Sequence, residues 1–199
     1  MRAALAVLAL AAGQAAAQNP SLSVTLRGRT PEVHVSRLLA DGKFPALMRS
    51  GLPLRLHYRL ELWRVRGRWF DQFVRDVQWD AVARHDPLAD DFVLLRPNGR
   101  TSRHATVDDL ARALEIPYRI PITPGGAGRF YFVCALAVTT LNDTDVAELE
   151  RWLRGEMEPA VTGGGSVGDA VARGLQRVLV RIAGLPRLTL QARSPAFRQ

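Results

Sequence analysis

Nine consecutive residues in the first third of the chain, from Leu54 to Leu62, alternate between apolar and polar side chains without a break. The even positions hold leucine or tyrosine, and the odd positions hold arginine, histidine or glutamate. Because successive side chains of a strand point to opposite faces of its sheet, this pattern predicts a strand with one buried and one solvated face. Apolar residues recur over 73–81 after a turn at 66–68, so the two segments predict a long antiparallel hairpin.

Shorter strand signals lie on both sides of this hairpin. They cover residues 22–27, 33–38, 92–96, 129–141 and 188–192, and Gly- or Pro-rich turns separate many of them. Helices are predicted after the N-cap residue Thr106, over 142–155 and over 169–183. The helices are placed irregularly, which differs from the regular alternation of a parallel sheet. We therefore expect a mainly β fold, an immunoglobulin-like antiparallel β-sandwich decorated with about three short helices.

The N-terminus has the three parts of a secretory signal peptide. Arg2 supplies a positive charge, residues 3–12 are apolar, and Ala15-Ala16-Ala17 is a small-residue cleavage pattern. The apolar run is about half the length that a membrane span needs, so cleavage is favoured over an anchor. We expect residues 1–17 to be removed and residues 18–199 to form a single exported domain. Its expected location is the periplasm, in solution or peripheral to the membrane.

The chain is strongly basic, with a formal net charge of +8, but this charge carries a compositional bias. Lys43 is the only lysine among 27 basic residues, and alanine is abundant, which indicates a GC-rich genome. Basic character is therefore a weak argument for nucleic-acid binding, and an exported protein rarely meets nucleic acid. No nucleic-acid partner is expected. An anionic membrane surface, an acidic glycan or an acidic protein face fits the charge better.

Two groups of arginines are candidate contact surfaces for such a partner. One group follows the polar face of the alternating strand toward the hairpin end and includes Arg55, Arg59 and Arg66. The other recurs every four residues along the third predicted helix, at Arg173, Arg177 and Arg181, and so forms one stripe. A solvated helix face is the alternative for that stripe. A glycine-rich linker and this basic helix, at about 158–183, are predicted to be inserted before the last strand.

The sequence offers little for catalysis or for binding metals and cofactors. Residues 164–168 match the G-x-S-x-G pattern around Ser166, but no strand precedes them and all four histidines lie upstream, so a flexible linker is favoured. The loop at 85–91, with His85 and nearby aspartates, lacks the histidine spacing of zinc enzymes and is interpreted as a solvated turn. Cys134 lies in an apolar run and is expected to be buried. We assign no catalytic, cofactor or metal residues.

Two segments resemble a known bacterial family. Residues 51–66, followed by Trp69-Phe70-Asp71, resemble the signature strand pair of the exported DUF4390 proteins. Residues 141–155 are similar to that family's next marked segment, and the resemblance covers roughly 22–155. The linker and basic helix depart from the family pattern, and the C-terminal end matches it loosely. The family has no established activity, so the resemblance implies no catalytic residues. It implies an envelope location and, because such proteins are often encoded near a membrane sensor kinase, a membrane-protein partner.

These observations predict a non-catalytic extracytoplasmic binding or accessory module. Its expected partner is an envelope membrane protein or the anionic membrane surface. One alternative is a carrier of a small apolar or anionic ligand inside the sandwich. Another is an envelope hydrolase that uses Ser166 or an acidic pair with His85.

Overall fold

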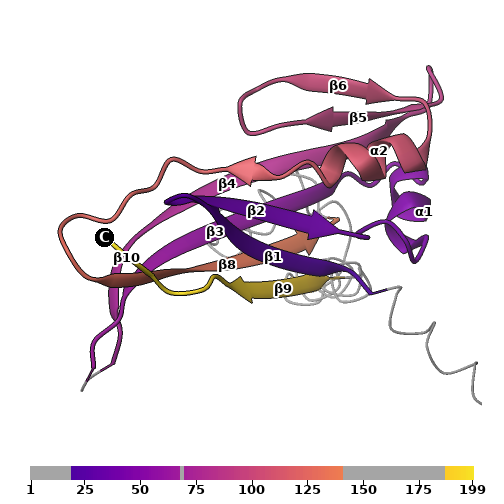
Figure 1. Ribbon diagram of the computed structural model, residues 1–199. Coiled ribbons are helices and arrows are strands. Elements are labelled where there is room, and N and C mark those ends of the chain that lie inside the picture. The colour runs from indigo at the N-terminus through magenta and orange to yellow at the C-terminus, as the bar shows by residue number, and fades with distance from the viewer. Residues whose placement is uncertain (1–18, 68–69, 141–186) are drawn as a thin grey trace, which may run out of the picture.

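A computed structural model describes residues 19–67, 70–140 and 187–199 (Figure 1). These residues form ten strands and two helices. In chain order the elements are β1 (Ser21–Arg27), β2 (Thr30–Ser36), α1 (Lys43–Arg49), β3 (Leu54–Arg64), β4 (Gln72–Asp86), β5 (Asp91–Leu95), β6 (Thr101–His104), α2 (Val107–Leu114), β7 (Tyr118–Arg119), β8 (Arg129–Thr139), β9 (Leu188–Arg193) and β10 (Phe197–Arg198).

The strands form two antiparallel sheets that pack face to face. The larger sheet has the order β10-β8-β3-β4-β5-β6, and β9 pairs with β8 along the same edge as β10. The smaller sheet has the order β1-β2-β7 and lies in front of the larger one in Figure 1. Strand β1 also lies against β9, which curls the two sheets together at that edge. The predicted mainly β fold, an antiparallel sandwich, is confirmed.

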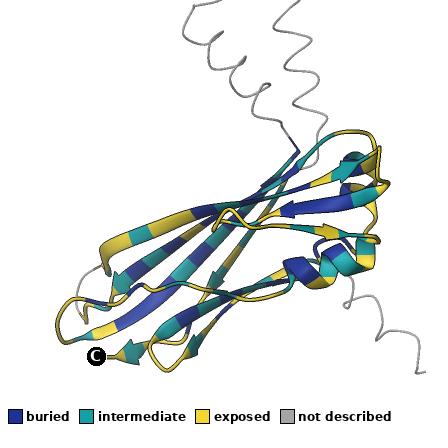
Figure 2. Ribbon diagram, turned by 90° about the horizontal axis from the view of Figure 1, so that it is seen from above, coloured by how far each residue is buried: buried dark blue, intermediate teal, exposed yellow. Residues whose placement is uncertain are grey.

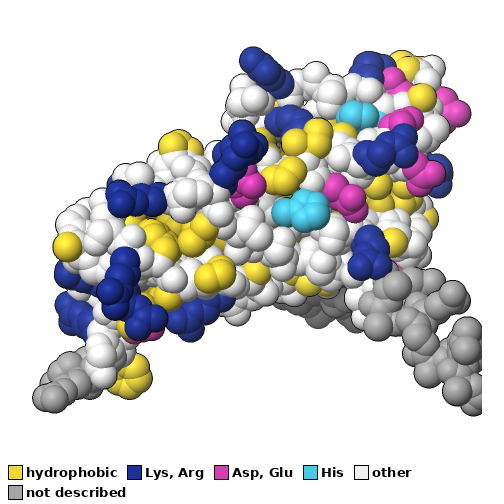
Figure 3. All heavy atoms as spheres, viewed as in Figure 1, with side chains coloured by type: hydrophobic (Ala, Val, Ile, Leu, Met, Phe, Trp, Pro, Cys, Tyr) yellow, Lys and Arg dark blue, Asp and Glu magenta, His cyan; other side chains and the backbone are white. Residues whose placement is uncertain are grey.

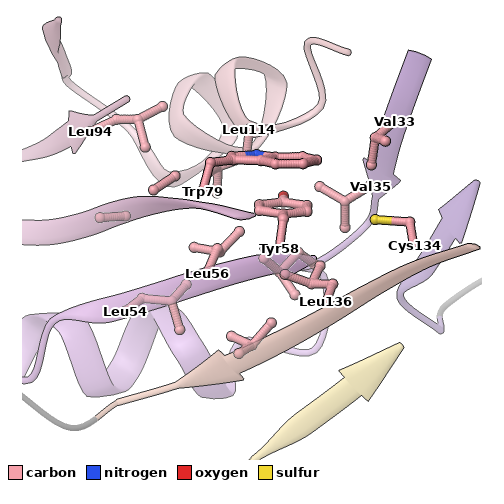
Figure 4. Close-up of a cluster of buried hydrophobic side chains, with 14 of the residues drawn as sticks. Val33, Val35, Leu54, Leu56, Tyr58, Trp79, Leu94, Leu114, Cys134 and Leu136 are labelled. Atoms are coloured by element: carbon pink, nitrogen blue, oxygen red, sulfur yellow. The ribbon is translucent and has the colours of Figure 1, made fainter. Parts of the chain in front are cut away.

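The alternating strand forms the centre of the core, as its sequence predicted. All five apolar side chains of β3 from Leu54 to Leu62 are 0% exposed. Buried apolar residues of the neighbouring strand β8 lie beside them on the same face of the sheet, and valines of the small sheet cover this face (Figures 2 and 4). Cys134 is one of the buried β8 residues, so the expectation of a buried thiol is confirmed.

The predicted hairpin forms, and its second strand is longer than expected. Strand β4 pairs with β3 from Leu54↔Ala83 to Arg64↔Gln72, with one register shift that leaves Val74 as an extra residue. Strand β4 continues through His85 to Asp86, because the backbone goes on pairing with β5 there. The prediction of a loop beginning at His85 is therefore wrong by two residues.

Both described helices pack on the sandwich at the end opposite the β3–β4 turn (Figure 1). Helix α2 begins as predicted, since the Thr106 side chain accepts a hydrogen bond from the Asp109 N–H at 3.1 Å. Helix α1 and strand β6 have no counterpart in the sequence prediction. The predicted helices over 142–155 and 169–183, the linker between them and the predicted signal peptide lie outside the described residues.

The cap of α2 gives a first testable prediction. Replacing Thr106 with alanine leaves the Asp109 N–H without its side-chain acceptor and should lower the free energy of unfolding by about 1 kcal/mol. Thr106→Ser keeps a hydroxyl that can accept from the Asp109 N–H and donate to the Asp109 carboxylate, and it should recover most of the loss. Urea denaturation of the three proteins measures this. Equal losses in both variants would show that the cap does not stabilise the helix.

Candidate binding surface at the hairpin end

The arginines predicted on the polar face of β3 lie beside acidic residues of β4. Nε and Nη2 of Arg55 donate to the Asp80 carboxylate at 3.2 and 3.1 Å. Nε of Arg59 lies 2.9 Å from the Asp76 carboxylate and 3.1 Å from the Glu61 carboxylate. The acids therefore offset the positive charge over the middle of this face. Whether Arg55 and Arg59 contact a partner stays a prediction.

Asp80 is the centre of this charged network. Burial alone would raise the pKa of Asp80, but hydrogen bonds from Arg55 and from His57, whose Nδ1 is 2.9 Å away, outweigh it and hold the pKa below its usual range. A carboxyl whose pKa falls on folding stabilises the fold above its unfolded-state pKa, and that contribution is lost as the pH falls through the folded-state pKa.

Asp80→Asn should therefore make stability fall less steeply with acid. The expected effect at neutral pH is below about 1 kcal/mol, because the Asp80 side chain is 38% exposed and water screens the pair. Thermal denaturation between about pH 6 and pH 2 measures it. The control is Asp108→Asn at high salt: Asp108 has no ion pair in the described part of the chain, and salt screens its attraction to the N-terminus of α2, so it should change the slope less than Asp80→Asn does. The same acid slope for wild type and Asp80→Asn would contradict the prediction.

Beyond the charged network, the end of the β3–β4 hairpin collects arginines from several strands. Strands β3, β4, β8, β9 and β10 all contribute, because β8 begins and β9 and β10 end beside the hairpin turn. All of these side chains are exposed. The group, named here the basic end, consists of Arg64, Arg66, Arg75, Arg129, Arg193 and Arg198.

Few carboxylates oppose the basic end. Within residues 19–67, 70–140 and 187–199, Arg193 alone in the group has a side-chain carboxylate within 4.0 Å, that of Asp71. Arg64 donates to the backbone carbonyl of Ala127 at 2.8 Å, and Arg75 donates to that of Thr123. These contacts position the guanidinium groups without neutralising them. The basic end therefore carries a local excess of positive charge.

Exposed apolar side chains lie among these arginines. Phe70 is 95% exposed, and Phe73 and Val74 are 43% and 37% exposed. The ring of Trp63 packs edge-on against Phe73, with centroids 5.6 Å apart. Figure 3 shows dark-blue basic groups gathered at the left end of the molecule around the protruding tip. Exposed aromatic and basic side chains together are typical of surfaces that contact the polar face of a membrane.

Asp71 holds the base of this hairpin end in place. Its carboxylate accepts the Arg66 backbone N–H at 3.1 Å and the Tyr131 hydroxyl at 2.9 Å. These two hydrogen bonds hold the pKa of Asp71 below its usual range. Because one bond comes from the hairpin and the other from β8, Asp71 joins the tip to the central sheet.

Within the described residues, the remaining candidate residues from the sequence do not come together in one catalytic or metal-binding site. The His85 ring Nε2 lies 3.1 Å from the Asp90 carboxylate, while Asp86 and Asp91 both bind Arg103. No cluster that could hold a metal ion occurs among the residues described. Burial raises the pKa of the Cys134 thiol to about 12. Ser166 and the predicted stripe of Arg173, Arg177 and Arg181 lie outside the described residues.

The fold and this surface define a class, an antiparallel β-sandwich domain with a basic, aromatic hairpin end. Residues 41–132 match the family described as Domain of unknown function (DUF4390). The resemblance is confirmed over that range, which contains the β3–β4 hairpin and the start of β8. No curated protein and no solved structure matches the chain. Neither helix in the described ranges is long and apolar enough to cross a membrane.

Proposed function

We propose that this protein is a non-catalytic binding or accessory module of the bacterial envelope that acts outside the cytoplasm at an anionic membrane surface. The observation that carries the proposal is the basic end, where exposed arginines surround the exposed Phe70. The signal-peptide pattern of residues 1–17 and the resemblance to exported proteins support the location. An envelope membrane protein is the alternative partner.

The chemistry of the basic end suits an anionic lipid surface. Each arginine held near such a surface contributes about 1 kcal/mol of attraction, which decays within a Debye length. Aromatic side chains such as Phe70 and Phe73 favour the headgroup region, where their apolar rings leave water. Together the two contributions give reversible, salt-sensitive binding without a membrane-spanning segment.

Co-sedimentation with vesicles tests this proposal. The purified protein should bind phosphatidylglycerol vesicles and should not bind phosphatidylcholine vesicles. Removing two charges from the basic end with Arg66→Gln and Arg129→Gln should weaken binding roughly 30-fold, from about 1 kcal/mol per arginine. The matched control, Arg84→Gln with Arg100→Gln, removes the same charge from exposed arginines outside the basic end and should change binding less than about twofold. Equal losses in the two double variants would overturn the assignment to the hairpin end.

Crosslinking in intact cells addresses the alternative partner. Repeated capture of one membrane protein, with no vesicle binding, would replace the lipid surface with a protein partner.

The same crosslinking experiment tests the predicted stripe. Changing Arg173, Arg177 and Arg181 to glutamate should abolish association if that helix contacts the partner. Unchanged association would remove the stripe from the proposal. The hydrolase alternative rests on Ser166, and labelling by a fluorophosphonate probe would support it.

A further inference from the structure

A pocket of about 320 Å³ opens on the side of the sandwich, and none of the arginines of the basic end lines it. Its floor comes from the middle of β4, and its walls come from the β5–β6 turn and from the segment that follows α2. The volume lies at the lower end of the range for small-molecule sites. The lining residues are Val77, Trp79, Arg96, Pro97, Asn98, Pro117, Tyr118, Arg119, Ile120 and Pro121.

Aromatic rings form the rigid part of this pocket. The Trp79 ring stacks on the buried Tyr58 ring, with centroids 5.1 Å apart and planes at 4° (Figure 4). The Tyr118 ring lies 5.9 Å from Trp79 and 5.3 Å from Tyr58. Three prolines in the walls fix the backbone around these rings. The pocket therefore presents a preformed apolar surface suited to a flat ligand.

One cation gives the pocket its polar side. Nη2 of Arg96 donates to the Ala113 carbonyl at 2.7 Å, and the guanidinium has no carboxylate partner within the described ranges. The Tyr118 hydroxyl lies fully buried behind the pocket wall, so Tyr118 offers a ligand its ring and not its hydroxyl. Burial raises the pKa of Tyr118, and the charge and hydrogen bonding of Arg96 partly offset the rise. Arg96 is therefore the group that would select an anion in this pocket.

We propose that this pocket binds a small aromatic anion, such as an aryl carboxylate or sulfonate. The flat apolar body packs between Trp79 and the proline walls, and the anionic group accepts hydrogen bonds from the remaining N–H groups of Arg96. Charge-assisted hydrogen bonds of this kind are roughly twice as strong as neutral ones. The inference goes beyond membrane binding, because none of the lining residues belongs to the basic end.

Fluorescence titration with anilinonaphthalene sulfonate tests the proposal. This probe carries an aromatic body and one anionic group, and N-phenylnaphthylamine is its uncharged analogue. The sulfonate should bind the native protein with saturation and at least about fivefold more tightly than the analogue, since the charge-assisted bond to Arg96 contributes more than 1 kcal/mol. Arg96→Gln should remove that preference and leave binding of the analogue unchanged.

A matched pair of variants keeps the proposal testable even if Arg96→Gln does not fold. Val77 lines the pocket and is 36% exposed, whereas Val74 lies outside it and is 37% exposed. Val77→Trp should fill the pocket and abolish saturable binding of the sulfonate, and Val74→Trp should leave it unchanged. Absence of saturable binding to the wild type, equal affinity for both probes, or unchanged binding by Val77→Trp would each overturn the proposal. Vesicle binding is measured separately, so either proposal can fail while the other stands.

Discussion

Replacing Phe132 with alanine should lower the free energy of unfolding by about 3–5 kcal/mol. Phe132 lies in the first half of β8, is 0% exposed and pairs with the equally buried Leu62 of β3. Its ring also stacks on Phe197 of β10, with centroids 5.4 Å apart. Deleting the ring leaves a cavity between the sheets and removes the apolar contact that holds the last strand.

The matched control is the same deletion at the hairpin tip. Phe70→Ala removes an identical ring that is 95% exposed, so its effect on stability should stay within about 0.5 kcal/mol. Urea denaturation with a common m-value compares the two variants. Similar losses at both positions would show that β8 is not the centre of the core. Phe70→Ala should nevertheless weaken binding to phosphatidylglycerol vesicles, which separates a contact residue from a folding residue.

The Cys134 thiol should react with Ellman's reagent at least several thousandfold more slowly in the native protein than in denaturant, because reaction requires the core to open against a stability of at least about 5 kcal/mol. Cys134 is 0% exposed, and burial raises the pKa of its thiol to about 12, so little thiolate forms at pH 8 in the folded state. As the chain contains a single cysteine, the release of thionitrobenzoate reports on this position alone.

Phe132→Ala provides the internal check on this labelling experiment. If the thiol reacts only after global unfolding, a loss of 3–5 kcal/mol should accelerate native-state labelling by roughly two to nearly four orders of magnitude. Phe70→Ala should leave the rate unchanged. Rapid labelling of the wild type would show that reagent reaches Cys134 through a local opening of the sheet edge, where β9 covers β8.

Most of the correct fold prediction came from hydrophobic periodicity and from helix-capping residues. The uninterrupted alternation of β3 identified the central strand and its buried face. Thr106 and Asp109 identified the start of α2.

Helix α1 gave no comparable signal, because it has seven residues, includes Pro45 and begins after Gly42 without a side-chain cap. Burial of Phe44 and Met48 holds it in place, which is a tertiary effect. Strand β6 was missed because its four residues are polar and it pairs with a single neighbour.

The candidate surface was only partly predictable. Arg66 was identified because it continues the arginine series of β3 toward the turn. The contribution of β8, β9 and β10 depends on strand order and register, which a single sequence does not determine. The same register places Asp80 directly opposite His57 and Asp76 opposite Glu61, so both acids lie within reach of the arginines of β3. Sequence alone showed a positive face there, and pairing with β4 makes it nearly neutral.

The adjoining ends of β8 and β9 mark a place where this domain can accept a different connecting sequence. Val138 pairs with Leu188, so the two strands are antiparallel neighbours whose adjoining ends lie side by side, although many residues separate them in sequence. A tight turn of two to five residues would suffice to connect such a pair. The pairings between the described strands would therefore remain in place if the sequence between β8 and β9 were exchanged. This junction is therefore a place where new segments can be grafted onto the two-sheet scaffold, at the end opposite the basic hairpin.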